Sequence, residues 1–184
     1  MSSRMLVASA LAAWAALAAV LFSPPSDAQG KRLTLNSADF TNGQGIPPQF
    51  TCEGPGTSPE LSWSNVPPAT QSLALVVRDP DAPSGEFAHW IVYDIAANTG
   101  EISQGAAAKA ALPAGAREGT NGSGSKGWTP PCPPRGTHHY QFELYALDTQ
   151  LPALKAPTGP ALFAAMRGHV LDRAELVGTY EKSR

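Results

Sequence analysis

The chain has 184 residues, and its 18 prolines and 17 glycines, about a fifth of the total, disfavour a long helical bundle. Charged residues make up 15% and apolar residues 42%, which is too little charge and too much core material for a disordered chain. The net charge is -2 and no run of Lys or Arg exceeds two residues, so a broad electrostatic surface for nucleic acid is excluded.

The start of the chain predicts an export signal. Arg4 supplies a positive charge, residues 5–22 are uncharged and rich in alanine, and Ser26 and Ala28 have the spacing that a signal peptidase accepts. We therefore expect cleavage after Ala28, a periplasmic or secreted location, and a single domain over residues 29–184 with no stable membrane insertion. The alternative is an uncleaved anchor, because 18 apolar residues lie at the short end of a bilayer-spanning length.

The rest of the chain predicts strands separated by loops. Runs of aliphatic, aromatic and β-branched residues predict strands over residues 72–78, 88–95 and 138–147, with shorter ones over 33–36, 60–64 and 176–180. A helix is predicted from residues 158–160, because Leu162, Phe163, Met166 and Val170 recur at helical spacing, and residues 106–112 favour a helical turn. The pattern indicates one mainly antiparallel β domain with a helix near its C-terminus.

Two cysteines, Cys52 and Cys132, lie 80 positions apart. In an oxidising compartment they are expected to pair, and closing so long a loop stabilises a fold by roughly 4 kcal/mol in the chain-entropy model. The alternative is two free buried thiols. Proline and glycine are concentrated in residues 43–59 and 119–136, each of which contains one cysteine. The disulfide is thus expected to join two loops beside a binding site.

Two aspartates follow the strand over residues 72–78. Asp79 continues the face of Leu73, Leu75 and Val77, and it opens the sequence Asp-Pro-Asp81-Ala-Pro, in which the prolines hold both acids in a fixed turn. The alternative is that both acids merely cap a turn.

Three histidines stand at the beginnings of strands. His89 shares the parity of Ile91, Tyr93 and Ile95, so its ring is expected to face the same way as these apolar residues, while the pair at 138–139 begins a later strand. A glycine-rich loop over residues 118–136 matches GxGxxG by letter but lacks the strand and helix that a dinucleotide site requires. Its backbone amides, together with the histidines, suggest a shallow anion site.

In its motifs the sequence resembles the phosphatidylethanolamine-binding protein family, in particular its bacterial, Raf kinase inhibitor-like branch. The similarity covers almost all of residues 29–184 and is carried, in order, by Thr51-Cys-Glu-Gly, Ser58-Pro-x-Leu-x-Trp63, Asp79-Pro-Asp-Ala-Pro83, His89-Trp90, Gly119-x-Asn121, Pro131-Cys-Pro-Pro-x-Gly136, His138-x-Tyr140 and Leu144-Tyr-Ala-Leu147. Two residues depart from the pattern, because Trp128 and Pro130 stand where the branch more often has Tyr and Gly. Both bear on the shape of the loop and the breadth of the pocket mouth.

The resemblance implies a large antiparallel sheet, a second smaller sheet, and a small pocket for phosphate-like anions. It places at this pocket Asp79, Asp81, His89, Pro131, Pro133, His138 and Tyr140. We expect Asp79 to orient His89 or to accept the ammonium of a phosphoethanolamine head group. Since a neighbouring carboxylate raises the pKa of histidine, binding is expected to strengthen as pH falls.

The leading interpretation is an exported binding protein for a small phosphorylated or anionic ligand, with regulation or inhibition of a partner protein implied by the family. No cofactor is implied, and an exported protein does not meet cytosolic kinases. The main alternative is a hydrolase that uses a His/Asp pair in the same pocket, although no motif supplies an activated nucleophile. A metal site formed by Asp79, His89 and His138 is a third reading without diagnostic spacing.

Overall fold

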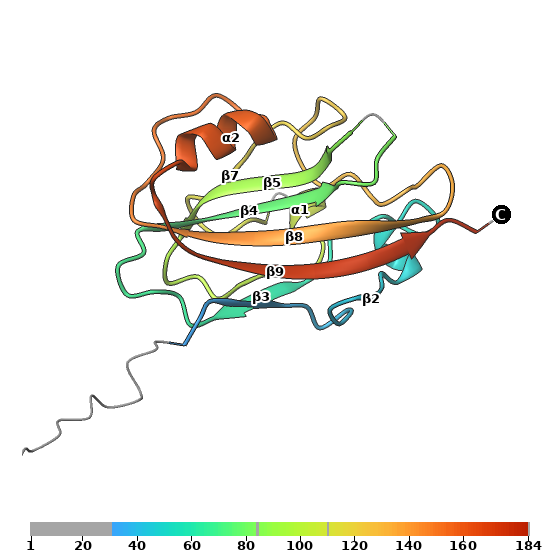
Figure 1. Ribbon diagram of the computed structural model, residues 1–184, viewed down its shortest axis with the longest axis horizontal. Coiled ribbons are helices and arrows are strands. Elements are labelled where there is room, and N and C mark those ends of the chain that lie inside the picture. Colours follow the sequence, from blue (N-terminus) through green and yellow to red (C-terminus); the bar gives the residue numbers. More distant parts are fainter. Residues whose placement is uncertain (1–30, 84, 110, 184) are drawn as a thin grey trace, which may run out of the picture. The chain divides into compact units, whose positions relative to one another are not determined.

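Strands form two sheets of unequal size in the computed structural model, which describes residues 31–83, 85–109 and 111–183. The small sheet has the order β1 (Thr34–Asn36), β3 (Leu61–Ser64), β6 (Glu101–Ile102). The large sheet has the order β2 (Gln44–Gly45), β9 (Val170–Glu181), β8 (Thr137–Leu147), β4 (Ser72–Asp79), β5 (Phe87–Ala96), β7 (Arg117–Glu118). Neighbouring strands are antiparallel except β2 and β9 (Figure 1). The predicted fold class is therefore confirmed, while the predicted signal segment, residues 1–28, lies outside the described residues.

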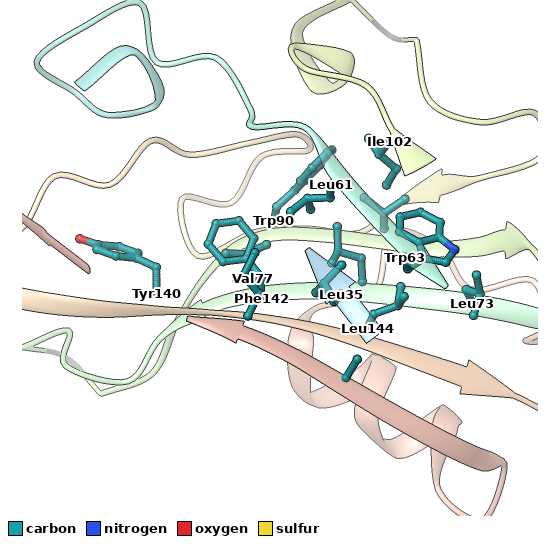
Figure 2. Packing of buried hydrophobic residues seen from close by; sticks show 14 of the residues in the cluster. Leu35, Leu61, Trp63, Leu73, Val77, Trp90, Ile102, Tyr140, Phe142 and Leu144 are labelled. Carbon is teal, nitrogen blue, oxygen red and sulfur yellow. The ribbon is translucent and has the colours of Figure 1, made fainter. Parts of the chain in front are cut away.

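Strand β4, at the centre of the large sheet, is buried on both faces, which explains why it is a nearly continuous apolar run. On one face Leu73, Leu75 and Val77 pack with side chains of the small sheet, including Leu61 and Trp63. Figure 2 shows Leu73, Val77, Leu61 and Trp63 in this cluster. On the other face Ala74 and Val76 belong to a second cluster with Leu162 and Met166 of α2 (Gly159–Met166). A strand covered on both sides has no polar face to alternate with.

The helices are short. The predicted turn over 106–112 is α1 (Ala106–Lys109), and a 3-10 turn spans Pro48–Phe50. Helix α2 ends at Met166, so the prediction that Val170 continues it was wrong. Gly168, with φ of 84°, turns the chain, and Val170 begins β9, which is much longer than the predicted 176–180. Among the helices of the described ranges, none is long and apolar enough to cross a membrane.

Two irregularities in the pairing of β4 with β5 decide which face each residue of β5 occupies. Val77 pairs with Trp90 but the next residue, Arg78, pairs with Ala88, so His89 is an extra residue on β5. A second shift lies between Leu73 and Leu75. Each extra residue interrupts the strict alternation of side chains between the two faces.

Candidate functional site

A small cavity of about 200 Å³ opens at one edge of the large sheet. Strand β4 ends here while β5 and β8 begin here, because β4 runs antiparallel to both. The cavity thereby collects side chains from three strands and from the loop that precedes β8. Its lining consists of Asp79, Ala82, Pro83, Phe87, His89, Thr129, Pro130, Cys132, Pro133, Pro134, His138 and Tyr140.

Asp79 and His138 form a buried pair in this cavity. The Nδ1 of His138 lies 2.7 Å from Oδ2 of Asp79, and the two residues are 6% and 4% exposed. The other oxygen of the carboxylate, Oδ1, accepts a hydrogen bond of 2.8 Å from the backbone N–H of Asp81. Asp79 therefore orients His138, and not His89 as the sequence suggested.

His89 reaches the cavity because of the extra residue in β5. Trp90 packs with the cluster between the sheets, whereas Ile91 and Tyr93 pack under α2. The rings of His89 and Trp90 both lie 6.1 Å from the ring of Trp128, so the two neighbours point to the same side of the sheet. The prediction that His89 shares a face with Ile91 and Tyr93 was therefore wrong, because strict alternation does not hold across a bulge.

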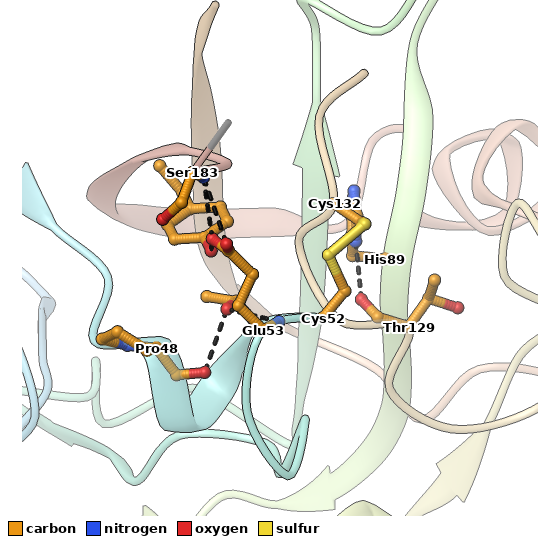
Figure 3. Close-up of a disulfide and its surroundings, with 9 residues drawn as sticks. Pro48, Cys52, Glu53, His89, Thr129, Cys132 and Ser183 are labelled. Carbon is orange, nitrogen blue, oxygen red and sulfur yellow. Dashed lines mark hydrogen bonds between the residues drawn. A yellow bond between two sulfur atoms is a disulfide. The ribbon is translucent and has the colours of Figure 1, made fainter. Parts of the chain in front are cut away.

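Thr129 fixes the orientation of the His89 ring. Its carbonyl oxygen lies 2.6 Å from Nδ1 of His89 (Figure 3). Its own N–H donates to the carbonyl of His89. Burial lowers the pKa of His89 and outweighs both the bond to Thr129 and the charge of Asp79, which raise it. The expected upward shift of this pKa was therefore wrong, because desolvation disfavours the charged ring.

Tyr140 lines the same cavity. The residue is fully buried, and within the described part of the chain its hydroxyl has no hydrogen-bond partner. Burial first, and then the charge of Asp79, raise the pKa of Tyr140, so the phenol stays protonated as a donor. The His89 ring stands edge-on to the Tyr140 ring, with centroids 5.1 Å apart.

The wall of the cavity is pinned by the predicted disulfide, Cys52–Cys132, with Cα atoms 5.3 Å apart. Cys132 and Pro133 line the cavity, whereas Pro131 does not, because its carbonyl faces the other loop and accepts the N–H of Cys52. The loop that contains Cys52 is also held by Glu53, which accepts hydrogen bonds from the Tyr180 hydroxyl and the Ser183 N–H. Figure 3 shows Glu53 and Ser183 beside the disulfide.

Asp81 also stays outside the cavity. Its side chain is exposed and accepts hydrogen bonds from the ring and the backbone N–H of His139, and these lower its pKa. Asp81 reaches the site indirectly, through the N–H that it gives to Asp79.

Several amides of the glycine-rich loop, which were expected to face a ligand, bond within the protein. The N–H groups of Gly119, Gly122 and Thr129 instead donate to carbonyls of β5. Phe87 also lines the cavity, although the sequence did not single it out. It lies at the start of β5 and pairs with Asp79, and this position is what could have indicated its role. Among the described residues, no three His, Cys, Asp or Glu side chains are grouped to hold a metal ion, so the metal reading gains no support.

Comparisons with known proteins agree on one family. The family model described as phosphatidylethanolamine-binding protein matches residues 36–181. A UPF0098 protein of Chlamydia muridarum is 42% identical over 155 residues, 82% of this chain and 99% of the relative. A Mycobacterium tuberculosis protein named "Putative lipoprotein LppC" is 42% identical over 81% of this chain and 72% of its own length. E. coli YbcL, described as a new member of the mammalian PEBP family, superposes with a TM-score of 0.78 at 32% identity, covering 83% of this chain and all of YbcL.

Proposed function

Since the chain belongs to the phosphatidylethanolamine-binding protein family, we propose that its cavity binds a small anion, a phosphate-like or phosphoethanolamine-type head group. The observation that carries this proposal is Tyr140, a residue of the cavity lining whose buried hydroxyl has no partner among the described residues. A buried donor left without a partner costs about 1–3 kcal/mol, and a ligand oxygen would recover this free energy by accepting the hydrogen bond.

Size and charge agree with this ligand class. A cavity of about 200 Å³ is smaller than the roughly 300–1,000 Å³ that buries a drug-sized molecule, so it suits a head group alone. The charge of Asp79 would repel an anion, but the hydrogen bond to His138 offsets it when that ring is protonated. Phe87 and Pro133 supply apolar contacts for a substituent on the phosphoryl group.

The proposal includes export to the periplasm or the medium. Both cysteines of the disulfide are exposed, and a bond accessible to cytosolic thiols persists where the surroundings are oxidising. The relative named as a lipoprotein agrees with an exported branch. Regulation or inhibition of a partner protein outside the cytoplasm is the further role that family membership suggests.

Calorimetric titration with phosphoethanolamine tests the ligand. We expect His138→Ala to weaken binding by at least about tenfold, because a hydrogen bond to a charged group contributes about 1.5–3 kcal/mol. Tyr140→Phe removes only the unpartnered hydroxyl and should weaken binding less. His169→Ala is the matched control, since that exposed histidine pairs with Asp148 and does not line the cavity. A wild type that binds neither phosphoethanolamine nor inorganic phosphate contradicts the proposal.

One observation favours a hydrolase as the second candidate. The Asp79–His138 pair has the arrangement of a general base held by a carboxylate. The hydroxyl groups among the lining residues are those of Thr129 and Tyr140, and Thr129 shares a hydrogen bond with Ser123. A panel of ester and phosphoester substrates decides between the candidates, because turnover that is lost in His138→Ala would replace the binding proposal by the enzymatic one.

A further inference from the structure

Both imidazole rings in the cavity have the same nitrogen turned into the protein. Nδ1 of His89 faces the carbonyl oxygen of Thr129 at 2.6 Å, and Nδ1 of His138 faces the carboxylate of Asp79 at 2.7 Å. A carbonyl has no proton to give, and an ionised carboxylate only accepts, so each Nδ1 carries a hydrogen. In the neutral ring the remaining nitrogen, Nε2, is then an acceptor. Within the described part of the chain neither Nε2 makes a hydrogen bond.

With both rings neutral, the two histidines therefore offer acceptors, their Nε2 atoms. The side-chain donors among the lining residues are the hydroxyl of Tyr140, which has no partner among the described residues, and that of Thr129, which shares a hydrogen bond with Ser123. The oxygen atoms of an oxyanion without protons would face the lone pairs of both Nε2 atoms. Contact between acceptors is unfavourable in a site that excludes water, because no hydrogen bond forms. An oxyanion with an O–H group would instead donate to one Nε2 and accept from Tyr140.

We propose that the cavity binds its anion together with a proton, and that it therefore selects oxyanions protonated near neutral pH, such as phosphates and phosphonates, over sulfate and sulfonates. This inference rests on the proposed function and adds to it the chemical class of the ligand. The proton either arrives on a ligand oxygen or is taken from solution onto an Nε2, where it becomes the N–H of an imidazolium. No covalent bond between protein and ligand forms or breaks.

The surroundings of His89 make its charge depend on the ligand. The ionisable groups that face it are Asp79 from β4 and His138 and Tyr140 from β8, while Phe87, Trp128 and Thr129 contribute no charge. Burial lowers the pKa of His89, which favours the neutral ring. Binding an anion that carries no O–H group is therefore expected to draw a proton onto it.

Calorimetry with inorganic phosphate and sulfate, each in two buffers of different ionisation heat, measures both affinity and protons taken up. At pH 7.5 we expect phosphate to bind at least about tenfold more tightly than sulfate, with net proton uptake when sulfate binds and less when phosphate, which brings its own O–H, binds. Sulfate brings no proton, so its affinity should rise by up to about tenfold per pH unit as pH falls toward 5. Methylphosphonate and methanesulfonate form a second pair of similar shape.

A glutamine variant locates the proton. In His89→Gln the side-chain amide supplies an N–H without a proton from solution, so the phosphate-to-sulfate ratio should shrink and proton uptake should fall. His138→Gln gives a second test if the first variant unfolds, and His169→Gln should leave the ratio unchanged. Equal affinities for phosphate and sulfate without proton uptake overturn this inference but leave the proposed function standing. A wild type that binds neither anion overturns both.

Discussion

His139 holds Asp81 with two hydrogen bonds to a single carboxylate oxygen, because its backbone N–H and its ring Nδ1 both lie 2.8 Å from Oδ2. Asp81 in turn donates its own N–H to Asp79. A chain of hydrogen bonds thus runs from an exposed histidine on β8, through the turn after β4, to the buried carboxylate in the cavity.

We predict that Asp81→Ala weakens phosphoethanolamine binding about two- to fivefold although Asp81 does not line the cavity. The exposed pair contributes about 0.2–1 kcal/mol, which is the order of free energy available to position Asp79. Titration calorimetry measures the change, and His139→Ala should have a smaller effect because the backbone N–H remains. A loss as large as that in Asp79→Ala would instead place Asp81 in contact with the ligand.

A second prediction concerns stability and pH. Because burial lowers the pKa of His89, the unfolded chain takes up this proton at a higher pH than the folded protein does. The stabilisation from a neutral His89 is thus fully present above the unfolded pKa of about 6.5 and is lost as pH falls from there toward the folded pKa.

Urea unfolding between pH 7.5 and 5 checks this sign. The free energy of unfolding of the wild type should fall more steeply with acid than that of His89→Gln. Saturating phosphate should reduce the difference in slope, since the occupied cavity favours the protonated ring. Parallel pH profiles for the wild type and the variant would show that His89 protonates alike in both states.

The disulfide gives a third prediction. Replacing both Cys52 and Cys132 by serine should lower the free energy of unfolding by about 4 kcal/mol, the chain-entropy value for a loop of this length. Because Cys132 and Pro133 line the cavity, the variant should also bind phosphoethanolamine less tightly at a temperature where it remains folded. Unchanged affinity would show that the hydrogen bond from Cys52 to Pro131 holds the wall without the covalent link.

A fourth prediction concerns the opposite face of the large sheet, where a buried ion pair lies away from the cavity. Glu143 is fully buried and pairs with Arg78, with Nε–Oε2 at 2.6 Å, and with Arg173, with Nη1–Oε1 at 3.2 Å. Glu143→Gln should lower the free energy of unfolding by about 3 kcal/mol, because Arg78 then loses the charge of its buried partner. Affinity for phosphoethanolamine should not change, since the Arg78 guanidinium lies over Phe163 of α2, away from the cavity. A change in affinity would reveal coupling through the sheet.

The sequence predicted which chemical groups meet in the cavity better than it predicted how they are connected. The positions of the long central strands β4, β5 and β8 followed from apolar runs, and the face of Asp79 followed from the alternation in β4. Alternation failed in β5, because an extra residue leaves no signature in composition or periodicity. Pro131 and Asp81 were placed by motif, and a motif does not reveal whether a side chain points into a cavity or braces it from behind.

Because His89 is an extra residue, the geometry of this site depends on the number of residues in β5 as well as on their side chains. Substitutions in β5 change the side chains, but they leave the number of residues unchanged. One residue still separates Trp90, which pairs with Val77, from Ala88, which pairs with Arg78. Removing Ala88 would return the strand to regular alternation and place His89 opposite Arg78, on the helix-covered side. The binding edge of this protein is thus more vulnerable to a one-codon deletion than to most exchanges of one amino acid for another.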